Sequence, residues 1–502
     1  MTSSNLIESL LCHPDESPAI RLPEGGMVTY GELNTMVADL ADAMVSAGLR
    51  KGDRVAFRGG KSVPTLAFYF ACLSAGLIYV PISEAHTRRE MEFFINDAQP
   101  AALYVDRLDG DAASAVGALP VPRILELPRL SGTGPARRPR PIPLGDADLA
   151  ALLYTSGTTG VPKGAMITHA SLLANARTLV DVWRFTAADV VLHTLPLSHG
   201  HGLFLGCHLP LMVGGSIMLA ARFNVEEAID LMPQSTVFMG VPTLYVRLLQ
   251  SPRFDREACR NLRLMISGSA PLPVDVFEKV AARTGVEIVE RFGTTETSIC
   301  ASQPLDGERR PGTVGVRLPD VDIGILDEDG AQKPAGEVGR LAVRGPNVFP
   351  GYWNQPDASG EVFTPDGFFL TGDLARLEPD GHLTIVGREK DMIISGGLNV
   401  YALEVEGVLR RFDGVADCAV IGVPHFDFGE AVVAVIVPEP GARFDNAAVR
   451  AFAQEHLAVY KAPKAIVLVE KLPRTTMGKV IKTELREAHR DLFLAEPVER
   501  PS

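Results

Sequence analysis

Residues 152–164 constrain the fold more than any other stretch, because they predict a buried strand that runs directly into a glycine-rich turn. The turn combines hydroxyl side chains with glycines, which let a backbone approach a ligand closely and adopt positive φ. Backbone amides, hydroxyls and the ammonium of Lys163 together suit a polyphosphate. Lys163 is followed by glycine, so the stretch differs from a Walker A loop, in which Gly-Lys precedes Ser or Thr. An ordinary surface turn is the competing interpretation.

Helical and strand patterns alternate on both sides of this stretch. A helix is expected over residues 30–44, capped by Thr29, and a short strand over residues 53–57. The alternation resumes after the turn and predicts α/β architecture with doubly wound sheets. The further expected elements are strands at 190–194, 217–220, 236–239 and 264–267, a helix at 170–182 and a helix from 225. The apolar run 190–221 is interpreted as strands and loops of a large core.

The length of 502 residues predicts two to four domains or subdomains. Residues 312–387 carry many short alternating segments and turns, which predict a small antiparallel β subdomain. Beyond residue 388 the pattern is that of a compact α+β unit. We therefore expect a large N-terminal domain over residues 1–388 and a small mobile C-terminal domain over residues 389–502.

Composition limits the class of protein. The net charge of -13 argues against non-specific nucleic-acid binding. The six cysteines form no Cys-x-x-Cys pair, which suits a reducing compartment without structural zinc. No secretory signal is visible at the N-terminus. The uncharged stretch 62–83 has the length of a membrane span, but Pro64, Gly76 and Pro81 break it into a buried helix and strand. A cytoplasmic protein without a membrane partner is expected.

The run Tyr-Thr-Ser-Gly-Thr-Thr-Gly-Val-Pro-Lys-Gly at 154–164 resembles the phosphate loop of the adenylate-forming enzymes, which include acyl-CoA synthetases, peptide-synthetase adenylation domains and firefly-type luciferases. The resemblance implies ATP as a ligand, and it implies a catalytic role for Thr155. The loop residues that it implies as phosphate ligands are Thr155, Ser156, Gly157, Thr158, Thr159, Gly160 and Lys163.

Two further motifs follow in the family's order. Ser-Gly-Ser-Ala-Pro-Leu at 267–272 resembles the adenine-side loop, and Arg-Phe-Gly-Thr-Thr-Glu at 291–296 resembles the Tyr/Phe-Gly-x-Thr-Glu motif. The implied nucleotide ligands are Gly268, Ser269, Ala270, Phe292, Gly293 and Thr295, and Glu296 is the implied catalytic Mg²⁺ ligand. The alternatives are a plain helix start at 267–272 and, for Glu296, a helix-start carboxylate near the macrodipole.

The C-terminal part carries three more matches. Asp373 and Arg388 resemble the family's ligands for the ribose hydroxyls, with a structural ion pair as the alternative. Lys390 falls at the position of the family's hinge. The family's glycine pair at 396–397 lets the backbone approach the pantetheine arm of coenzyme A.

Gly396 and Gly397 are therefore implied to meet coenzyme A after a domain rotation. The segment Pro-Arg-Thr-Thr-Met-Gly-Lys at 473–479 resembles the loop that bears the family's adenylation lysine. Lys479 is then the catalytic residue that meets the carboxylate and the α-phosphate. A solvated surface charge is the alternative.

Within the family, several segments resemble the malonyl-CoA synthetases, among them residues 179–185 and 239–245. A second carboxylate on the substrate would need a fixed donor, and Arg291 can bind one through two parallel hydrogen bonds. His199 and His201 lie where the family's acyl-pocket loop is found, and His199 could polarise the reacting carboxylate. An ion pair of Arg291 with a neighbouring glutamate, and buried histidines without a ligand, are the alternatives. The expected substrate contacts are Arg291, His199, His201, Val241 and Thr243.

These matches imply an ATP-dependent ligase that converts malonate, through an acyl-AMP, to malonyl-CoA, AMP and pyrophosphate. Ser198 and the pair at 294–295 depart from the malonyl group's usual residues, which leaves methylmalonate open. Other small acids, or a carrier protein in place of coenzyme A, are the alternatives. We expect ATP, Mg²⁺ and coenzyme A as cofactors, a small dicarboxylic acid as substrate, and a monomer or small homo-oligomer.

Overall fold

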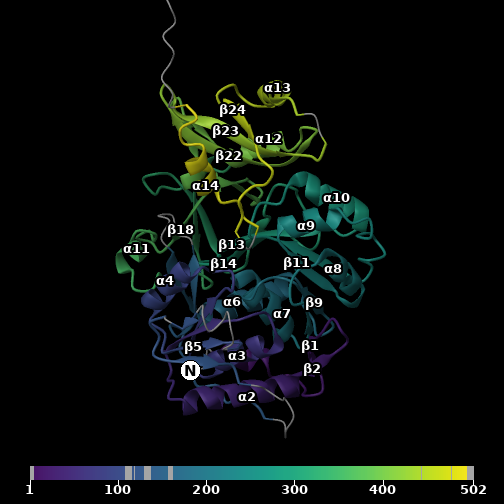
Figure 1. The fold of residues 1–502 in the computed structure, drawn as a ribbon, viewed down its shortest axis with the longest axis vertical. Helices are drawn as coiled ribbons and strands as arrows, with labels where there is room; N and C mark the ends of the chain where they lie inside the picture. The colour runs from purple at the N-terminus through teal and green to yellow at the C-terminus, as the bar shows by residue number, and fades with distance from the viewer. Residues whose placement is uncertain are drawn as a thin grey trace, which may run out of the picture. The chain divides into compact units, whose positions relative to one another are not determined.

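A computed structural model describes residues 5–107, 116–117, 119–128, 137–155, 162–441, 444–475 and 478–493. The chain has an α/β fold that divides into two compact units. The first unit comprises Met1–Ile323 and Ala342–Thr371, and the second comprises Gly324–Leu341 and Gly372–Ser502. Figure 1 shows the course of the chain with its elements labelled.

A six-stranded sheet in the first unit has the order β6-β5-β3-β4-β7-β8. Its strands are parallel except for the final pair, β7 and β8, which is antiparallel. That pair carries the expected phosphate loop between its strands. The bounds are β3 (Arg54–Arg58), β4 (Ile78–Ile82), β5 (Ala102–Val105), β6 (Ile124–Glu126), β7 (Leu149–Thr155) and β8 (Lys163–Thr168).

A nine-stranded sheet in the same unit has the order β15-β14-β13-β12-β11-β9-β10-β1-β2. Its central strands run parallel, and their burial on both faces explains their continuous apolar sequences. The expected strand at 264–267 is confirmed residue for residue. The bounds are β1 (Pro18–Arg21), β2 (Met27–Thr29), β9 (Val190–His193), β10 (Ser216–Leu219), β11 (Val237–Gly240), β12 (Leu264–Ser267), β13 (Ile288–Thr294), β14 (Ser298–Ser302) and β15 (Val316–Arg317).

Helices of the first unit begin where the sequence places caps. Thr29 caps α2 (Tyr30–Ser46), as the sequence predicts, and with Glu32 it forms a complete capping box. Ser62 caps the buried helix α3 (Val63–Ser74), which packs against α2 (Figure 1). The other helices are α1 (Ile7–Leu10), α4 (Arg88–Ala98), α6 (His169–Val182), η1 (His201–Leu205), α7 (Gly206–Met212), α8 (Val225–Leu231), η2 (Met232–Gln234), α9 (Pro242–Leu249), α10 (Val274–Thr284) and α11 (Pro356–Gly360).

The interpretation of residues 190–221 as strands and loops is wrong for its middle part. His201–Leu205 forms one π-helical turn, and α7 continues it to Met212. Both are almost wholly buried, so their sequence lacks the polar face that marks a surface helix. A buried helix and a buried strand cannot be told apart by periodicity alone.

Two small sheets lie wholly or largely in the second unit. One has the order β16-β17-β18-β19, and the other has the order β21-β20-β23-β22 with β24 beside β23. In Figure 1, α12, α13 and α14 lie with β22, β23 and β24 in the yellow part of the chain. The bounds are β16 (Asp322–Leu326), β17 (Val338–Arg344), β18 (Phe369–Leu377), β19 (Leu383–Arg388), η3 (Glu389–Asp391), β20 (Ile393–Ser395), β21 (Leu398–Val400), α12 (Ala402–Leu409), β22 (Val415–His425), β23 (Gly429–Pro438), α13 (Asn446–His456), β24 (Ala465–Leu468) and α14 (Lys482–Ala488).

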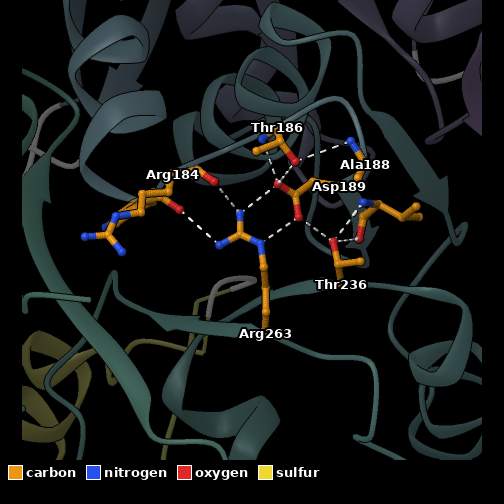
Figure 2. Close-up of polar contacts among 8 residues, drawn as sticks. Arg184, Thr186, Ala188, Asp189, Thr236 and Arg263 are labelled. Carbon is orange, nitrogen blue, oxygen red and sulfur yellow. Dashed lines mark hydrogen bonds and ion pairs between the residues drawn. The ribbon is translucent and has the colours of Figure 1, made fainter. Parts of the chain in front are cut away.

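A polar clamp joins the beginnings of three neighbouring strands of the nine-stranded sheet (Figure 2). Asp189, directly before β9, accepts hydrogen bonds at 2.7 Å from Nε and Nη2 of Arg263, which precedes β12. Thr236, directly before β11, donates to the same carboxylate at 2.7 Å. Because these contacts satisfy a buried carboxylate, they fix the relative positions of the strands that carry the site described next.

Among the described residues, none of the helices combines the length and the apolar character needed to cross a bilayer.

Candidate active site

The antiparallel strands β7 and β8 bring Thr155 and Lys163 opposite each other in register. The residues between them, including the expected ligands Ser156, Gly157, Thr158, Thr159 and Gly160, lie outside the described residues. Lys163 is 9% exposed, so an ammonium group is held within the fold rather than in bulk water. Burial of the Lys163 ammonium suits a side chain that binds an anionic ligand.

Glu296 lies in the turn between β13 and β14. Its Oε1 accepts a hydrogen bond from Thr155 at 3.3 Å and one from the hydroxyl of Tyr352 at 3.1 Å. The alternative that placed Glu296 at a helix start is wrong, because Thr294 and Thr297 close a turn here through mutual hydrogen bonds. The structure thus joins two residues of the predicted nucleotide site, Thr155 and Glu296, across the two sheets of the first unit.

Tyr352 is a residue of this cluster that the sequence reasoning missed. It is 8% exposed, and its ring lies under the Lys163 ammonium, with Nζ 5.1 Å from the ring centroid. A Gly-Tyr-Trp run at 351–353 after a proline was the available signal. This run alone did not indicate a functional site, because aromatic residues in turns usually pack into the hydrophobic core.

Arg291 on β13 is buried, with 5% of its surface exposed. Its Nε and Nη2 have no hydrogen-bond partner in the part of the chain that the structure describes. Burial lowers the pKa of Arg291 to about 10, against a smaller raising contribution from Cys300, so the guanidinium stays charged at neutral pH. The alternative of an ion pair with a neighbouring glutamate is not what the structure shows, since these two nitrogens are unpaired.

The guanidinium of Arg291 lies directly over Gly268. A Cβ on Gly268 would stand 2.4 Å from Cζ of Arg291, so only glycine leaves room for this side chain. The neighbouring Ser269 has a positive φ of 70° and holds its hydroxyl 3.3 Å from Nδ1 of His201. The expected adenine-side residues Gly268, Ser269 and Ala270 therefore lie in the turn between β12 and α10, beside Arg291.

His201 begins the π-helical turn, and it is buried with 5% of its surface exposed. Burial lowers the pKa of His201 well below its usual value, and the charge of Arg291 lowers it further, so the imidazole is neutral. Its Nε2 has no hydrogen-bond partner among the described residues. Arg291 and His201 are thus buried side chains with unsatisfied polar atoms, and the exposed Ser269 lies beside them.

His199 precedes this turn and is half-buried. Burial lowers the pKa of His199 to about 4, with a smaller contribution from His86, so it too is neutral. The segment that carries His199 is tightly folded, and residue 202 has no room for a side chain. A Cβ on Gly202 would stand 2.1 Å from the carbonyl oxygen of Pro196. Lys61 adds to this by donating to the carbonyls of His193 and Leu195 at 3.1 and 3.0 Å.

The remaining predicted residues of the first unit lie at the ends of its central strands. Val241 is buried and caps α9 directly after β11, and Thr243 is half-buried in the first turn of that helix. Phe292, Gly293 and Thr295 follow Arg291 along β13 and into its turn. Gly293 is required there, since a Cβ would stand 1.7 Å from the carbonyl oxygen of Ser298.

In the second unit, Asp373 on β18 faces Arg388 at the end of β19. Nε of Arg388 donates to Oδ1 of Asp373 at 2.7 Å, and Asp373 is 3% exposed. The ion pair that the sequence left as an alternative therefore exists. Lys390 lies in the short turn η3 directly after Arg388.

Gly396 and Gly397 form the two-residue turn between β20 and β21. Both have positive φ, 61° and 78°, which is the geometry of a tight hairpin that favours glycine.

Lys479 belongs to a short hairpin in which its amide donates to the Thr475 hydroxyl at 3.2 Å. The residue as a whole is exposed, yet loss of surrounding water lowers the pKa of its ammonium to about 8. The charges of Arg388 and Lys390 lower it further, whereas Asp373 and Asp391 oppose them. The second unit thus gathers Asp373, Arg388 and Lys479 in one electrostatic environment.

Comparisons with known proteins identify the family of the chain. The sequence model for the AMP-binding enzyme matches residues 8–353, and the model for the AMP-binding enzyme C-terminal domain matches residues 404–479. The chain belongs to the AMP-binding enzyme family. The first of these matches covers more than half of the chain.

Characterised relatives of this AMP-binding enzyme differ in the acid that their names give. A feruloyl-CoA synthase of Amycolatopsis sp is 36% identical over 92% of this chain and 94% of that protein. A mitochondrial malonate–CoA ligase of Mus musculus is 35% identical over 92% of this chain and 86% of that protein. The crystal structure of ATP-bound MatB from Rhodopseudomonas palustris aligns with a TM-score of 0.93 and 43% identity, covering 98% of this chain and 100% of that one.

The AMP-binding enzyme described here is an AMP-forming acid–thiol ligase, with ATP and coenzyme A as the substrates that accompany the acid. The boundary between domains at 388 and the roles of the individual residues stay predictions. Among the described residues no group of three or more His, Cys, Asp or Glu side chains could hold a metal ion by itself.

Proposed function

We propose that this ligase activates a small dicarboxylic acid, malonate foremost, and converts it through an acyl-AMP to the acyl-CoA, AMP and pyrophosphate. The observation that carries the proposal is the buried guanidinium of Arg291, two of whose N–H-bearing nitrogens have no partner among the described residues. A buried cation without an anion is costly, and a substrate carboxylate would remove that cost through two parallel hydrogen bonds. A monocarboxylate has no second anionic group to offer once its first has reacted.

The names of the relatives support a small dicarboxylic acid as substrate, but they do not decide the choice. A malonate–CoA ligase of Mus musculus and MatB of Rhodopseudomonas palustris match along almost the whole chain, but so does a feruloyl-CoA synthase. Methylmalonate remains the second candidate, because His199, His201, Val241 and Thr243 are proposed to shape the acyl pocket and would set the room beside the α-carbon.

The first half-reaction would join a carboxylate oxygen of the acid to the α-phosphorus of ATP, with pyrophosphate leaving. We assign Thr155 and Lys163 to the phosphates and Glu296 to the Mg²⁺ that accompanies the nucleotide. The carboxylate of Glu296 fits this role, since both hydroxyl donors engage Oε1 while Oε2 makes no hydrogen bond among the described residues. Mg²⁺ bound there would supply charge neutralisation for the phosphates.

The nucleoside would be held by Gly268, Ser269, Ala270, Phe292, Gly293 and Thr295 and, through its ribose hydroxyls, by Asp373 and Arg388. His199 is neutral and could donate a hydrogen bond that polarises the reacting carboxylate. We propose Lys479 as the cation that stabilises charge on the α-phosphate in this step.

In the second half-reaction the thiolate of coenzyme A would attack the acyl carbonyl and expel AMP. We propose that the C-terminal domain rotates about Lys390 before this step. The rotation would withdraw Lys479 and bring in the hairpin of Gly396 and Gly397. The positive φ values of that hairpin expose backbone at its tip, which suits the close approach of a pantetheine arm.

The test is coenzyme A-dependent release of AMP with malonate, methylmalonate, succinate, acetate and a medium-chain fatty acid. Arg291→Ala should lower kcat/KM for dicarboxylates by about 10²-fold or more, the effect of two lost charged hydrogen bonds, and should leave monocarboxylates nearly unchanged. Arg247→Ala, which removes an exposed arginine from α9, is the matched control.

Preference for monocarboxylates in the wild-type protein, or equal loss with all acids in Arg291→Ala, would remove the dicarboxylate assignment. The ligase class would stand in either case.

A further inference from the structure

The segment 349–353 connects two parts of the first unit that carry the proposed phosphate and metal contacts. The amide of Trp353 donates to the carbonyl of Gly164 at 2.8 Å, and Tyr352 forms an antiparallel bridge with Ala165, so the segment pairs with β8. At its other end, the amide of Phe349 donates to the carbonyl of Glu296 at 2.8 Å. The backbone of this one segment is therefore bonded both to the Lys163 strand and to the Glu296 turn.

Tyr352 lies between these two attachments. Its hydroxyl donates to Oε1 of Glu296 at 3.1 Å, and its ring faces the Lys163 ammonium at 5.1 Å from the centroid. Its amide donates to the Ser359 hydroxyl at 2.8 Å, and its ring packs edge-to-face on Phe349, with centroids 4.9 Å apart. The side chain is thus fixed at both its backbone and its ring.

We infer that Tyr352 is a positioning residue that fixes the Glu296 carboxylate and the Lys163 ammonium relative to each other, so that Mg²⁺ and the phosphates of one ATP meet both. The hydroxyl acts on the carboxylate by holding Oε1, so that Oε2 would be available to bind the metal. The ring acts on the ammonium through its π face, an attraction that is strongest where water is excluded. The inference rests on the proposed role of Glu296 and is independent of which acid the enzyme activates.

The two contacts can be separated by substitution. Tyr352→Phe removes the hydroxyl and keeps the ring, whereas Tyr352→Leu removes both. Thr155→Val removes the other hydroxyl that donates to Glu296. Tyr30→Phe is the matched control, because Tyr30 is also buried and its hydroxyl donates to the Gly215 carbonyl at 2.9 Å, away from this cluster.

The measurement is equilibrium binding of ATP to the full-length protein by calorimetry, without any acid, once in excess Mg²⁺ and once in EDTA. In Tyr352→Phe the affinity in EDTA should equal that of the wild-type protein, while the gain on adding Mg²⁺ should fall by about tenfold, the effect of one lost hydrogen bond to a charged group. Tyr352→Leu should in addition weaken binding in EDTA by about fivefold, through loss of the cation–π contact. Tyr30→Phe should change neither value.

An unchanged Mg²⁺-dependent gain in Tyr352→Phe would overturn the inference, as would equal losses with and without Mg²⁺. Glu296→Gln separates this failure from that of the proposed function. If Glu296→Gln keeps the full gain, the assignment of Glu296 to the metal fails. If Glu296→Gln loses the gain and Tyr352→Phe keeps it, the role of Tyr352 alone fails. Because Tyr352→Phe preserves the packed ring, this result does not depend on whether Tyr352→Leu folds.

Discussion

Glu290 and Arg291 are neighbours on β13 whose side chains point to opposite faces of the sheet, as alternation along a strand requires. Burial raises the pKa of Glu290 to about 8, although a hydrogen bond from the Leu272 amide at 3.0 Å opposes the shift. The folded protein therefore carries a neutral acid at residue 290 and a cation at residue 291. The two neighbouring side chains thus lie on opposite faces of the sheet, and only Arg291 is charged at neutral pH.

A pH dependence of stability follows from Glu290. The unfolded carboxyl releases its proton near pH 4.5 and the folded one near pH 8, so between these values the folded state binds more protons and stability falls as pH rises. Glu290→Gln keeps an acceptor for the Leu272 amide and removes the titration. Urea unfolding of both proteins should show the wild-type protein losing up to about 1.4 kcal/mol per pH unit relative to the variant between about pH 5 and about pH 7.5. Parallel pH profiles would contradict a protonated Glu290.

The sequence singled out Arg291 because a dicarboxylate needs a fixed donor. The structure shows its side chain buried with two unpaired nitrogens, and its contact with the substrate stays a prediction. Tyr352 was not identified, because its proposed role depends on contacts with Lys163 and Glu296, which are far from it in the sequence. A residue that acts by connecting two distant segments leaves no pattern within its own segment.

At the scale of elements, the clamp of Asp189, Thr236 and Arg263 ties the beginnings of β9, β11 and β12 together (Figure 2). Burial raises the pKa of Asp189, but the hydrogen bonds from Arg263 and Thr236 outweigh this and lower it below its usual value. Arg263→Met would leave a carboxylate that is 3% exposed without its charged partner. We expect this variant to lose about 2–4 kcal/mol of stability at neutral pH, because an uncompensated buried charge remains.

Urea unfolding measures the stability lost in Arg263→Met, and two further variants test whether the uncompensated buried charge causes it. Arg253→Met removes an arginine whose carboxylate partners are exposed, and should leave the unfolding midpoint nearly unchanged. Asp189→Asn combined with Arg263→Met should recover part of the loss, since the buried charge is gone. Because a lowered folded pKa stabilises only above the unfolded value, the wild-type advantage should vanish as pH falls through and below 3.8. Equal effects of Arg263→Met and Arg253→Met would show that the clamp contributes little.

Elements were predictable from the sequence where local signals agree. The cap at Thr29 marked the start of α2, and the short buried run of β12 was predicted with its observed bounds. The helix α7 and the π-helical turn before it were missed, because they contain Pro210 and are buried on all sides. Their conformation is decided by tertiary packing, and tertiary packing overrides local propensity.

At the scale of the whole molecule, the proposed chemistry divides between the units, with Lys479 in the second and Glu296 in the first. The pKa of Lys479, lowered to about 8, implies that its charge is lost as pH rises through that value. In the wild-type protein, kcat/KM for ATP in pyrophosphate release without coenzyme A should therefore fall above about pH 8. Lys479→Arg should remain level to about pH 9, because a guanidinium keeps its proton there.

The second half-reaction supplies the control for this prediction. Lys479→Ala should lower acid-dependent pyrophosphate release by about 10²-fold or more, yet react normally when acyl-AMP and coenzyme A are supplied. A flat profile in the wild-type protein, or loss of both half-reactions in Lys479→Ala, would contradict a role confined to the first step.

The order of the units along the chain has a consequence for genetic recombination. The chain enters the second unit at Gly324, leaves it at Leu341 and returns at Gly372, so that unit is assembled from two separate stretches of sequence. One crossover between two related genes, in the stretch between β17 and β18, would give a second unit of mixed parentage, with β16 and β17 from one parent and the later strands from the other. Such a recombinant would fold only where the strands of the two parents are interchangeable, which favours close relatives. Between more distant relatives, two additional crossovers would be needed to exchange the second unit whole.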